Sequence, residues 1–240
     1  MDRERIFLIL LIIGLAGFSV YIGEHNSNAV QISDVFELEP SSYPQTLGNT
    51  DYGYVIRGGP YGNKDSKVKI AYIIGVHPLE FKSHEAILDV LLNNQNSLKY
   101  SYYIYMIKVT RDAFDYNNGR SNGQLLAYEY AVPDIEAKKF NLVLDVHSNV
   151  GDYKEKRFLD VPVNDNISKD LAYQIMNKIS WASFYIPPAE KGPTSGPYVI
   201  LPLIHSGIPT IVYETYRYEP YKLTLEHANQ LIKAVDRLNL

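Results

Sequence analysis

Short apolar runs alternate with amphipathic segments along most of the chain. Four runs are rich in branched or aromatic residues and too short for most helices, so they predict buried strands. They span 70–76, 102–109, 141–146 and 210–213. Apolar positions at helical spacing predict helices over 81–93, 166–179, 199–205 and 223–238, and a further helix beginning within 124–130. This alternation is typical of an α/β fold with a mostly parallel or mixed central sheet and helices on both faces.

The N-terminal segment has a different pattern. Residues 6–23 are uncharged, and a run of this length is about what a helix needs to cross a bilayer. Basic residues precede the run in MDRER, and none follows until Arg57, so the N-terminus is expected in the cytoplasm. We therefore expect a cytoplasmic tail, a single-pass transmembrane signal anchor, a linker and an extracytoplasmic catalytic domain, at 1–5, 6–23, 24–45 and 46–240. A cleaved signal peptide is the alternative, although no A-x-A-like site follows the run.

The composition narrows the chemistry. With 23 basic and 27 acidic residues, the chain has a net charge of -4, which gives no electrostatic reason to expect a nucleic-acid partner. The sequence contains no cysteine, which excludes disulfides, thiolate metal ligands and cysteine nucleophiles. A zinc site in this chain must therefore use histidine and carboxylate ligands.

Candidate ligands follow three of the predicted strands. The first strand leads into HPLE at 77–80, where Pro78 favours the start of a helix and places His77 and Glu80 on one side of a turn. His147 follows the third strand and Glu214 the fourth. Open α/β sheets bind ligands outside the carboxyl ends of their strands. A purely structural interpretation of the H-x-x-E pair is a strand end followed by a helix whose first turn favours an acid.

These residues suit a catalytic zinc site. Two histidines and one carboxylate supply three protein ligands and leave the fourth tetrahedral position for water. That water needs a base, and Glu214 at the end of an apolar strand is the candidate.

The motifs HPLE at 77–80, DVHS at 145–148 and YET at 213–215 resemble the zinc carboxypeptidase superfamily, including its succinylglutamate desuccinylase and aspartoacylase branch. The resemblance covers roughly 69–214. It implies that His77, Glu80 and His147 hold one Zn²⁺ ion and that Glu214 is the general base or acid. It also implies that Asp145 orients a zinc-bound imidazole.

The residues that bind the substrate match the family less well. The family has an Asn-Arg pair whose arginine grips a substrate carboxylate, whereas here a glycine separates Asn118 from Arg120. Arg120 is the candidate clamp and Arg111 its substitute, since a guanidinium binds a carboxylate through two parallel hydrogen bonds. A solvated loop arginine is the alternative for either. The family's mobile tyrosine has a candidate in Tyr198, which could equally be a packing residue.

Together these features predict a membrane-anchored, extracytoplasmic, zinc-dependent amide hydrolase. We expect a carboxypeptidase-like metallopeptidase that acts on peptides bearing a carboxylate, with cell-wall peptides as one candidate. An N-acyl amino acid deacylase and a catalytically silent peptide-binding domain are the alternatives. The remaining histidines, His25, His84, His205 and His227, are expected to be structural or solvated.

Overall fold

The computed structural model describes residues 44–188 and 194–240. The predicted membrane-spanning run and the linker up to residue 43 lie outside these residues. Among the helices of the described part, none has both the length and the apolar character needed to cross a bilayer.

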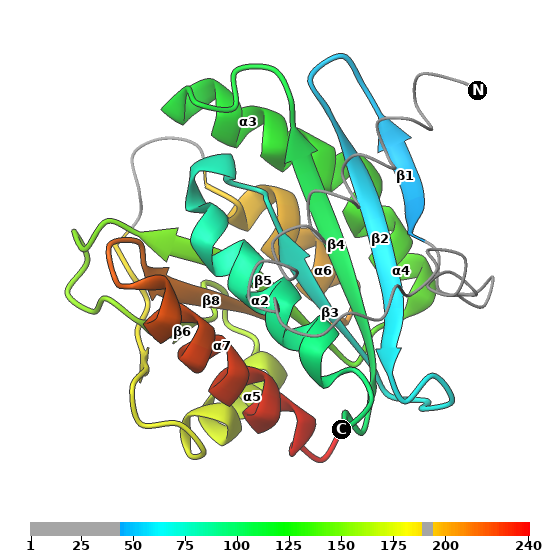
Figure 1. The fold of residues 1–240 in the computed structure, drawn as a ribbon, viewed down its shortest axis with the longest axis vertical. Coiled ribbons are helices and arrows are strands. Elements are labelled where there is room, and N and C mark those ends of the chain that lie inside the picture. The colour runs from blue at the N-terminus through cyan, green and yellow to red at the C-terminus, as the bar shows by residue number, and fades with distance from the viewer. Residues whose placement is uncertain (1–43, 189–193) are drawn as a thin grey trace, which may run out of the picture. The chain divides into compact units, whose positions relative to one another are not determined.

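Eight strands form one sheet in the order β1-β2-β4-β3-β5-β8-β6-β7 (Figure 1). The strands β4, β3, β5 and β8 run parallel at its centre, whereas β1, β2 and β6 are antiparallel to their inner neighbours. This arrangement confirms the predicted mixed sheet. The strands are β1 (Gln45–Asn49), β2 (Gly53–Gly62), β3 (Lys69–Ile74), β4 (Ser101–Val109), β5 (Leu142–Asn149), β6 (Phe158–Asp160), β7 (Ser183–Phe184) and β8 (Thr210–Tyr216).

Helices cover both faces of the sheet, as predicted. Alternate side chains of β3 enter two separate cores: Tyr72 packs with α2, α5 and α7, and Ile73 packs with the helical residues between β4 and β5 and with α6. The α-helices are α2 (Phe81–Asn94), α3 (Tyr116–Leu126), α4 (Val132–Lys138), α5 (Asn166–Met176), α6 (Leu201–His205) and α7 (Tyr221–Asp236). The helical segments of other types are η3 (Pro78–Glu80), η4 (Ala127–Ala131) and η5 (Gly196–Ile200).

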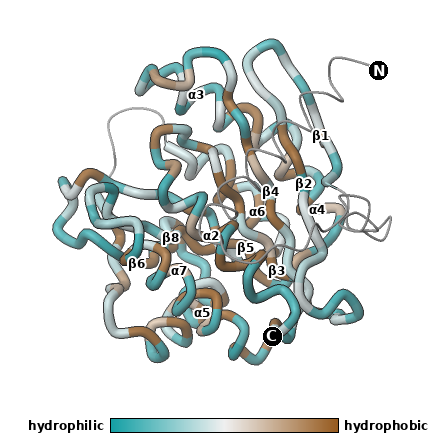
Figure 2. The backbone as a smooth tube through the Cα atoms, viewed as in Figure 1, coloured by the Kyte–Doolittle hydropathy of each residue, from teal (hydrophilic) through white to brown (hydrophobic). Residues whose placement is uncertain are grey.

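The hydropathy of the chain follows this layering. In Figure 2 the hydrophobic stretches gather along the inner strands and the helix faces turned toward them, whereas the outer loops are hydrophilic. Val143 and Leu144, neighbours on β5, are both fully buried because each faces one of the two cores. A parallel strand covered on both faces reads as a continuous apolar run, which is why the sequence identifies β5 and β3 so clearly.

One predicted helix begins earlier than expected. The sequence predicts its start within 124–130, but α3 begins at Tyr116, and its first turn is capped by the Asp115 carboxylate, which accepts hydrogen bonds from the backbone N–H groups of Asn117 and Asn118. Glycine and asparagine are poor helix formers, so this helix depends on tertiary packing. Gly119 allows that packing, because a Cβ at this position would lie only 2.9 Å from the backbone oxygen of Asp112.

Two predicted strands extend further than expected. The strands β5 and β8 continue to pair from His147 and Glu214 to Asn149 and Tyr216. His147 and Glu214 therefore lie inside paired strands rather than just beyond them, and the backbone hydrogen bonds of the ladder fix their positions. Asp145 lies two residues before His147 on the same face of β5.

Candidate metal centre and adjoining cavity

The turn after β3 places His77 and Glu80 side by side. Gly75 has φ +89°, and a Cβ at this position would lie 2.0 Å from the backbone oxygen of Ile107. Only glycine fits there. Pro78 then begins η3, in which the Glu80 N–H donates to the His77 carbonyl at 3.0 Å. The turn brings both side chains to the carboxyl end of β3.

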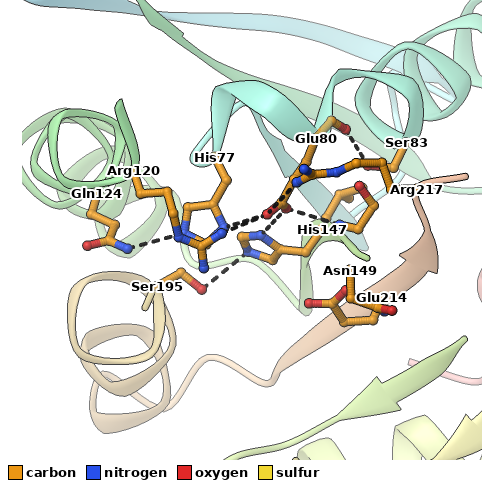
Figure 3. A network of polar contacts seen from close by, with 12 residues as sticks. His77, Glu80, Ser83, Arg120, Gln124, His147, Asn149, Ser195, Glu214 and Arg217 are labelled. Carbon is orange, nitrogen blue, oxygen red and sulfur yellow. Dashed lines mark hydrogen bonds and ion pairs between the residues drawn. The ribbon is translucent and has the colours of Figure 1, made fainter. Parts of the chain in front are cut away.

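His147 completes a cluster with these two residues (Figure 3). Its Nδ1 lies 2.9 Å from Glu80 Oε2, and the Nδ1 of His77 lies 3.1 Å from Glu80 Oε1. Donor atoms from all three residues lie within 4.8 Å of one another, and all three side chains are buried. The three residues predicted as ligands therefore lie together, close enough for their donor atoms to share one ion.

The protonation states of the cluster differ from residue to residue. Burial lowers the pKa of His77 to about 4, so its imidazole is neutral at pH 7. Burial alone would raise the pKa of Glu80, but the neighbouring His77 and His147 bring it well below the usual value. Burial likewise opposes a charge on His147, but Asp145 and Glu80 hold the pKa of His147 well above its usual range. His77 and Glu80 are therefore in the neutral and ionised forms that bind a metal ion, whereas His147 would release a proton on binding one.

Polar groups hold the far side of each imidazole. Asp145 Oδ2 lies 2.8 Å from His147 Nε2 at ion-pair distance, and Ser195 Oγ lies 3.2 Å from the same nitrogen. The Gln124 amide nitrogen lies 3.1 Å from His77 Nε2, and a turned-over amide would accept a hydrogen bond there instead. Each Nδ1 is thereby directed at Glu80, which is the orientation needed for a shared ion.

Of these orienting groups, the sequence predicts Asp145 but neither Gln124 nor Ser195. Gln124 lies on α3, within the segment that the sequence does predict to be helical, but no spacing signal links it to His77. Ser195 comes from the distant segment before η5, and no spacing signal links it to His147.

Glu214 reaches the same end of the sheet from β8. It pairs directly with His147 in the ladder between β5 and β8. Asn149 Nδ2 donates a hydrogen bond of 3.1 Å to Glu214 Oε2, and the side chain is half-buried at the edge of a cavity. In Figure 3 Glu214 lies apart from the three ligand residues and next to Asn149. This position leaves the carboxylate able to reach a bound molecule.

The predicted substrate-binding residues separate into two groups. Arg120 is at the site, where its Nη1 donates to Glu80 Oε1 at 2.9 Å and its guanidinium lies 5.0 Å from the Tyr116 ring. Arg111 is half-exposed and forms an ion pair with Asp51 at 2.5 Å. Asn118 and Tyr198, like Arg111, do not line the cavities beside the cluster. Asn118 is exposed on the first turn of α3, and Tyr198 packs edge-on against Tyr128.

A cavity of about 560 Å³ adjoins the cluster. It contains both cationic and anionic side chains. Its walls include Glu80, Tyr116, Arg120, Ser148, Asn149, Asp152, Tyr153, Lys154, Tyr185, Glu214 and Arg217. The sequence does not single out Arg217, which follows β8 by one residue.

A second, smaller cavity of about 170 Å³ shares Glu214 and Arg120 with the first. His77, His147 and Ser195 form part of its wall together with Asp160, the last residue of β6. Asp160 is buried, and its Oδ1 has no hydrogen-bond partner among the described residues. Burial raises the pKa of Asp160 to about 7.

Three of the other histidines are placed by the structure, and His25 lies outside the described residues. His84 Nε2 lies 3.1 Å from the backbone oxygen of Val146, and burial lowers the pKa of His84 to about 4. His227 stacks on Trp181 with ring centroids 4.2 Å apart. His205 is exposed at the end of α6. These environments agree with the structural or solvated roles expected for them.

No family model matches the sequence, and no curated protein matches it either. Solved structures do match. The tripeptide-bound cell shape determinant Csd4 from Helicobacter pylori has a TM-score of 0.54 at 11% identity, over 76% of this chain and 54% of that one. A metallo-carboxypeptidase from Burkholderia cenocepacia has a TM-score of 0.53 at 11% identity, over 82% and 64% of the two chains.

A third match is a metallo-carboxypeptidase from Pseudomonas aeruginosa in complex with (2-guanidinoethylmercapto)succinic acid. Its TM-score is 0.50 at 11% identity, over 80% of this chain and 62% of that one. The aligned region spans about half the length of Csd4 and less than two thirds of either carboxypeptidase. At such low identity the likeness concerns the fold, and it agrees with the superfamily that the sequence motifs resemble. The chain therefore has the fold of the metallo-carboxypeptidases.

Proposed function

We propose that this chain is a zinc-dependent amide hydrolase of the metallocarboxypeptidase type. One observation carries the proposal: the donor atoms of His77, Glu80 and His147 lie within 4.8 Å of one another at the carboxyl end of the central strands. Three such ligands from nitrogen and oxygen are typical of catalytic zinc. A fold shared with metallo-carboxypeptidases supports the same assignment.

The ion would be held by His77, Glu80 and His147, and when bound it would activate water and polarise the scissile carbonyl. The orientation of the ligands comes from neighbouring side chains. Asp145 and Ser195 contact the imidazole of His147, and Gln124 contacts that of His77.

Glu214 would act as the general base and then as the acid. Its carboxylate is half-buried and anchored by Asn149, so it is positioned without being withdrawn from the cavity. It would take a proton from the attacking water and deliver it to the leaving amine. Arg120, beside Glu80, would bind a substrate carboxylate or carbonyl oxygen through its guanidinium.

Replacing Glu214 by Gln tests this assignment. We expect zinc content to stay unchanged and hydrolysis to fall by about 10²–10⁴-fold, because only the proton carrier is lost. Glu226→Gln, on the exposed side of α7, is the matched control and should keep full activity. Full turnover in the Glu214 variant would rule out Glu214 as the base.

The substrate proposed is a peptide with a free carboxylate. Two of the matching structures contain a tripeptide and a succinic acid derivative, respectively. The peptides of a cell wall are the specific candidate, because the N-terminal run supports a membrane-anchored domain outside the cytoplasm. Protease treatment of intact cells should degrade the domain but not a cytoplasmic marker, and protection of both would contradict this topology.

The two alternative functions give different results in the same assays. A deacylase would hydrolyse N-acyl amino acids and leave peptides intact. A silent binding domain would bind peptides and hydrolyse neither class of substrate.

A further inference from the structure

A second arginine points at the metal centre. Arg217 follows β8, and its backbone N–H donates to the Asn149 carbonyl at 2.9 Å, which ties it to the end of β5. Its Nη2 lies 3.8 Å from Glu80 Oε1. That carboxylate oxygen also accepts a hydrogen bond from Arg120 at 2.9 Å, so two guanidinium groups share one oxygen of a candidate metal ligand (Figure 3).

Arg217 has few partners of its own. Its side chain is 21% exposed, its Nε is buried without a hydrogen-bond partner among the described residues, and 3.8 Å is a long ion pair. A guanidinium has five N–H donors, and buried cations are usually paired. Arg217 also forms part of the wall of the 560 Å³ cavity, so a molecule in the cavity can supply the acceptors it lacks.

The charge of the cavity indicates which molecule that is. The cavity wall carries three cationic side chains, Arg120, Lys154 and Arg217, and three anionic ones, Glu80, Asp152 and Glu214. A divalent ion at the cluster would make this set net positive. The ion would also bind Glu80, which now pairs with both guanidinium groups. Its positive charge would then repel the charges of Arg120 and Arg217. A carboxylate bound to Arg217 would relieve that repulsion.

We propose that Arg217 is the specificity residue of the large cavity, that it binds a carboxylate of the substrate, and that it couples this binding to metal occupancy of the His77, Glu80 and His147 cluster. The proposal rests on the zinc hydrolase function proposed above. It assigns the carboxylate contact to Arg217 and leaves Arg120, which donates to Glu80, for a carbonyl oxygen of the substrate. Arg111 is excluded from the contact because its guanidinium is paired with Asp51. Thermodynamic linkage then requires that metal tighten carboxylate binding and that carboxylate tighten metal binding by the same factor.

The test is a calorimetric titration of the full-length chain with succinate, in the zinc-free and zinc-loaded states. We expect zinc to tighten succinate binding by about 5-fold or more in the parent chain, within the usual range of coupling between sites. In Arg217→Gln we expect zinc still to bind, succinate binding to weaken by roughly 10–100-fold, and the coupling to vanish. Arg217→Lys should recover part of the succinate affinity and part of the coupling, because lysine keeps the positive charge but lacks the two parallel N–H donors of a guanidinium.

The matched control is Arg111→Gln, which removes an arginine from the same end of the sheet but outside the cavity and should titrate like the parent chain. An unchanged coupling factor in a folded Arg217→Gln protein would overturn the proposal, because succinate would then be contacting the ion or Arg120 instead.

Peptide pairs identify the source of the carboxylate. A peptide with a free C-terminus and its C-terminal amide should differ in KM by roughly 10–100-fold in the parent chain and hardly at all in Arg217→Gln, with kcat little changed. If instead a side-chain carboxylate is the one bound, an Asp-to-Asn change in the peptide gives that difference. Hydrolysis with neither difference overturns the role of Arg217 alone, whereas absence of both zinc binding and hydrolysis overturns the proposed function.

Discussion

At the scale of single residues, the two imidazoles of the cluster differ because their neighbours differ. His77 faces the neutral amide of Gln124, and burial keeps it uncharged, whereas His147 faces the carboxylate of Asp145. Asp145 is fully buried, and neither of its oxygens accepts a well-formed hydrogen bond from a described residue. The electrostatic partner of this carboxylate is His147, so Asp145 acts on the site by orienting and polarising that imidazole.

Replacing Asp145 by Asn should therefore weaken zinc binding by about 10–100-fold, because His147 loses the group that orients it and strengthens it as a ligand. Competition with a zinc-binding dye measures the change. Asp170→Asn, exposed on α5, is the control and should bind zinc like the parent chain. Equal zinc affinity in both variants would show that Asp145 does not support the ligand.

Asp160 gives a prediction about stability and pH. Its pKa is raised by burial from 3.8 to about 7, so the folded chain binds a proton that the unfolded chain releases. The folded state is therefore stabilised below pH 4, and that stabilisation is lost as the pH rises to 7. Asp160→Asn removes the cost of the buried charge and should raise the free energy of unfolding at pH 8 by about 2 kcal/mol, with little change at pH 4. Chemical denaturation at both pH values tests this, and an equal effect at the two would contradict it.

At the scale of elements, the approach of α3 to β3 decides which side chains reach the site. A Cβ on Gly123 would lie 2.0 Å from the Val76 carbonyl oxygen, so α3 can approach the end of β3 only with glycine there. Arg120 and Gln124, on the same helix, contact Glu80 and His77 because of this approach. The glycines that conceal the first part of α3 in the sequence are thus the ones that dock it.

Gly123→Ala should push α3 away from β3 and lower both stability and activity. Overpacking of this kind costs about 1–3 kcal/mol, and the lost contacts of Arg120 should appear as a reduced kcat/KM. Leu125→Ala, an exposed change on the same helix, is the control for helix propensity. If Gly123→Ala behaved like the control in both measurements, the docking of α3 would not matter for the site.

The elements that the sequence predicts are those whose burial gives a continuous apolar run, as in β3, β5 and β8. The elements it misses are the short strands β1 and β6 and the first part of α3, which contains Gly119 and Gly123. Their stability comes from pairing or packing with distant segments, which local sequence does not record. The same reason explains the site: His77, Glu80 and His147 follow recognisable strands, whereas Ser195 and Arg217 reach it only through the folded topology.

At the scale of the whole molecule, four parallel strands bring together residues that lie far apart in sequence. Glu80 is 67 positions before His147, and His147 is 67 positions before Glu214, yet all three lie at one end of the sheet. A metal ion at this end would add a link between β5 and the segment after β3, which contact each other through the hydrogen bonds of Glu80 with His147 and Ser148. Its removal should loosen the fold as well as stop catalysis.

Zinc binding should therefore raise the melting temperature. At a free zinc concentration about 100 times the dissociation constant, the stabilisation is about 2.7 kcal/mol, which corresponds to roughly 5–10 °C for a domain of this size. A thermal scan with zinc and with a chelator measures the shift. In His147→Ala the shift should disappear, and its persistence there would place the ion elsewhere.

The most direct test of this metal centre is anomalous diffraction at the zinc edge from crystals of the zinc-loaded protein. We expect one strong peak between Nδ1 of His77, Nδ1 of His147 and the Glu80 carboxylate, at about 2.0–2.2 Å from each donor atom. A zinc-loaded protein with no peak at that position would contradict the central claim that these three residues form the metal centre.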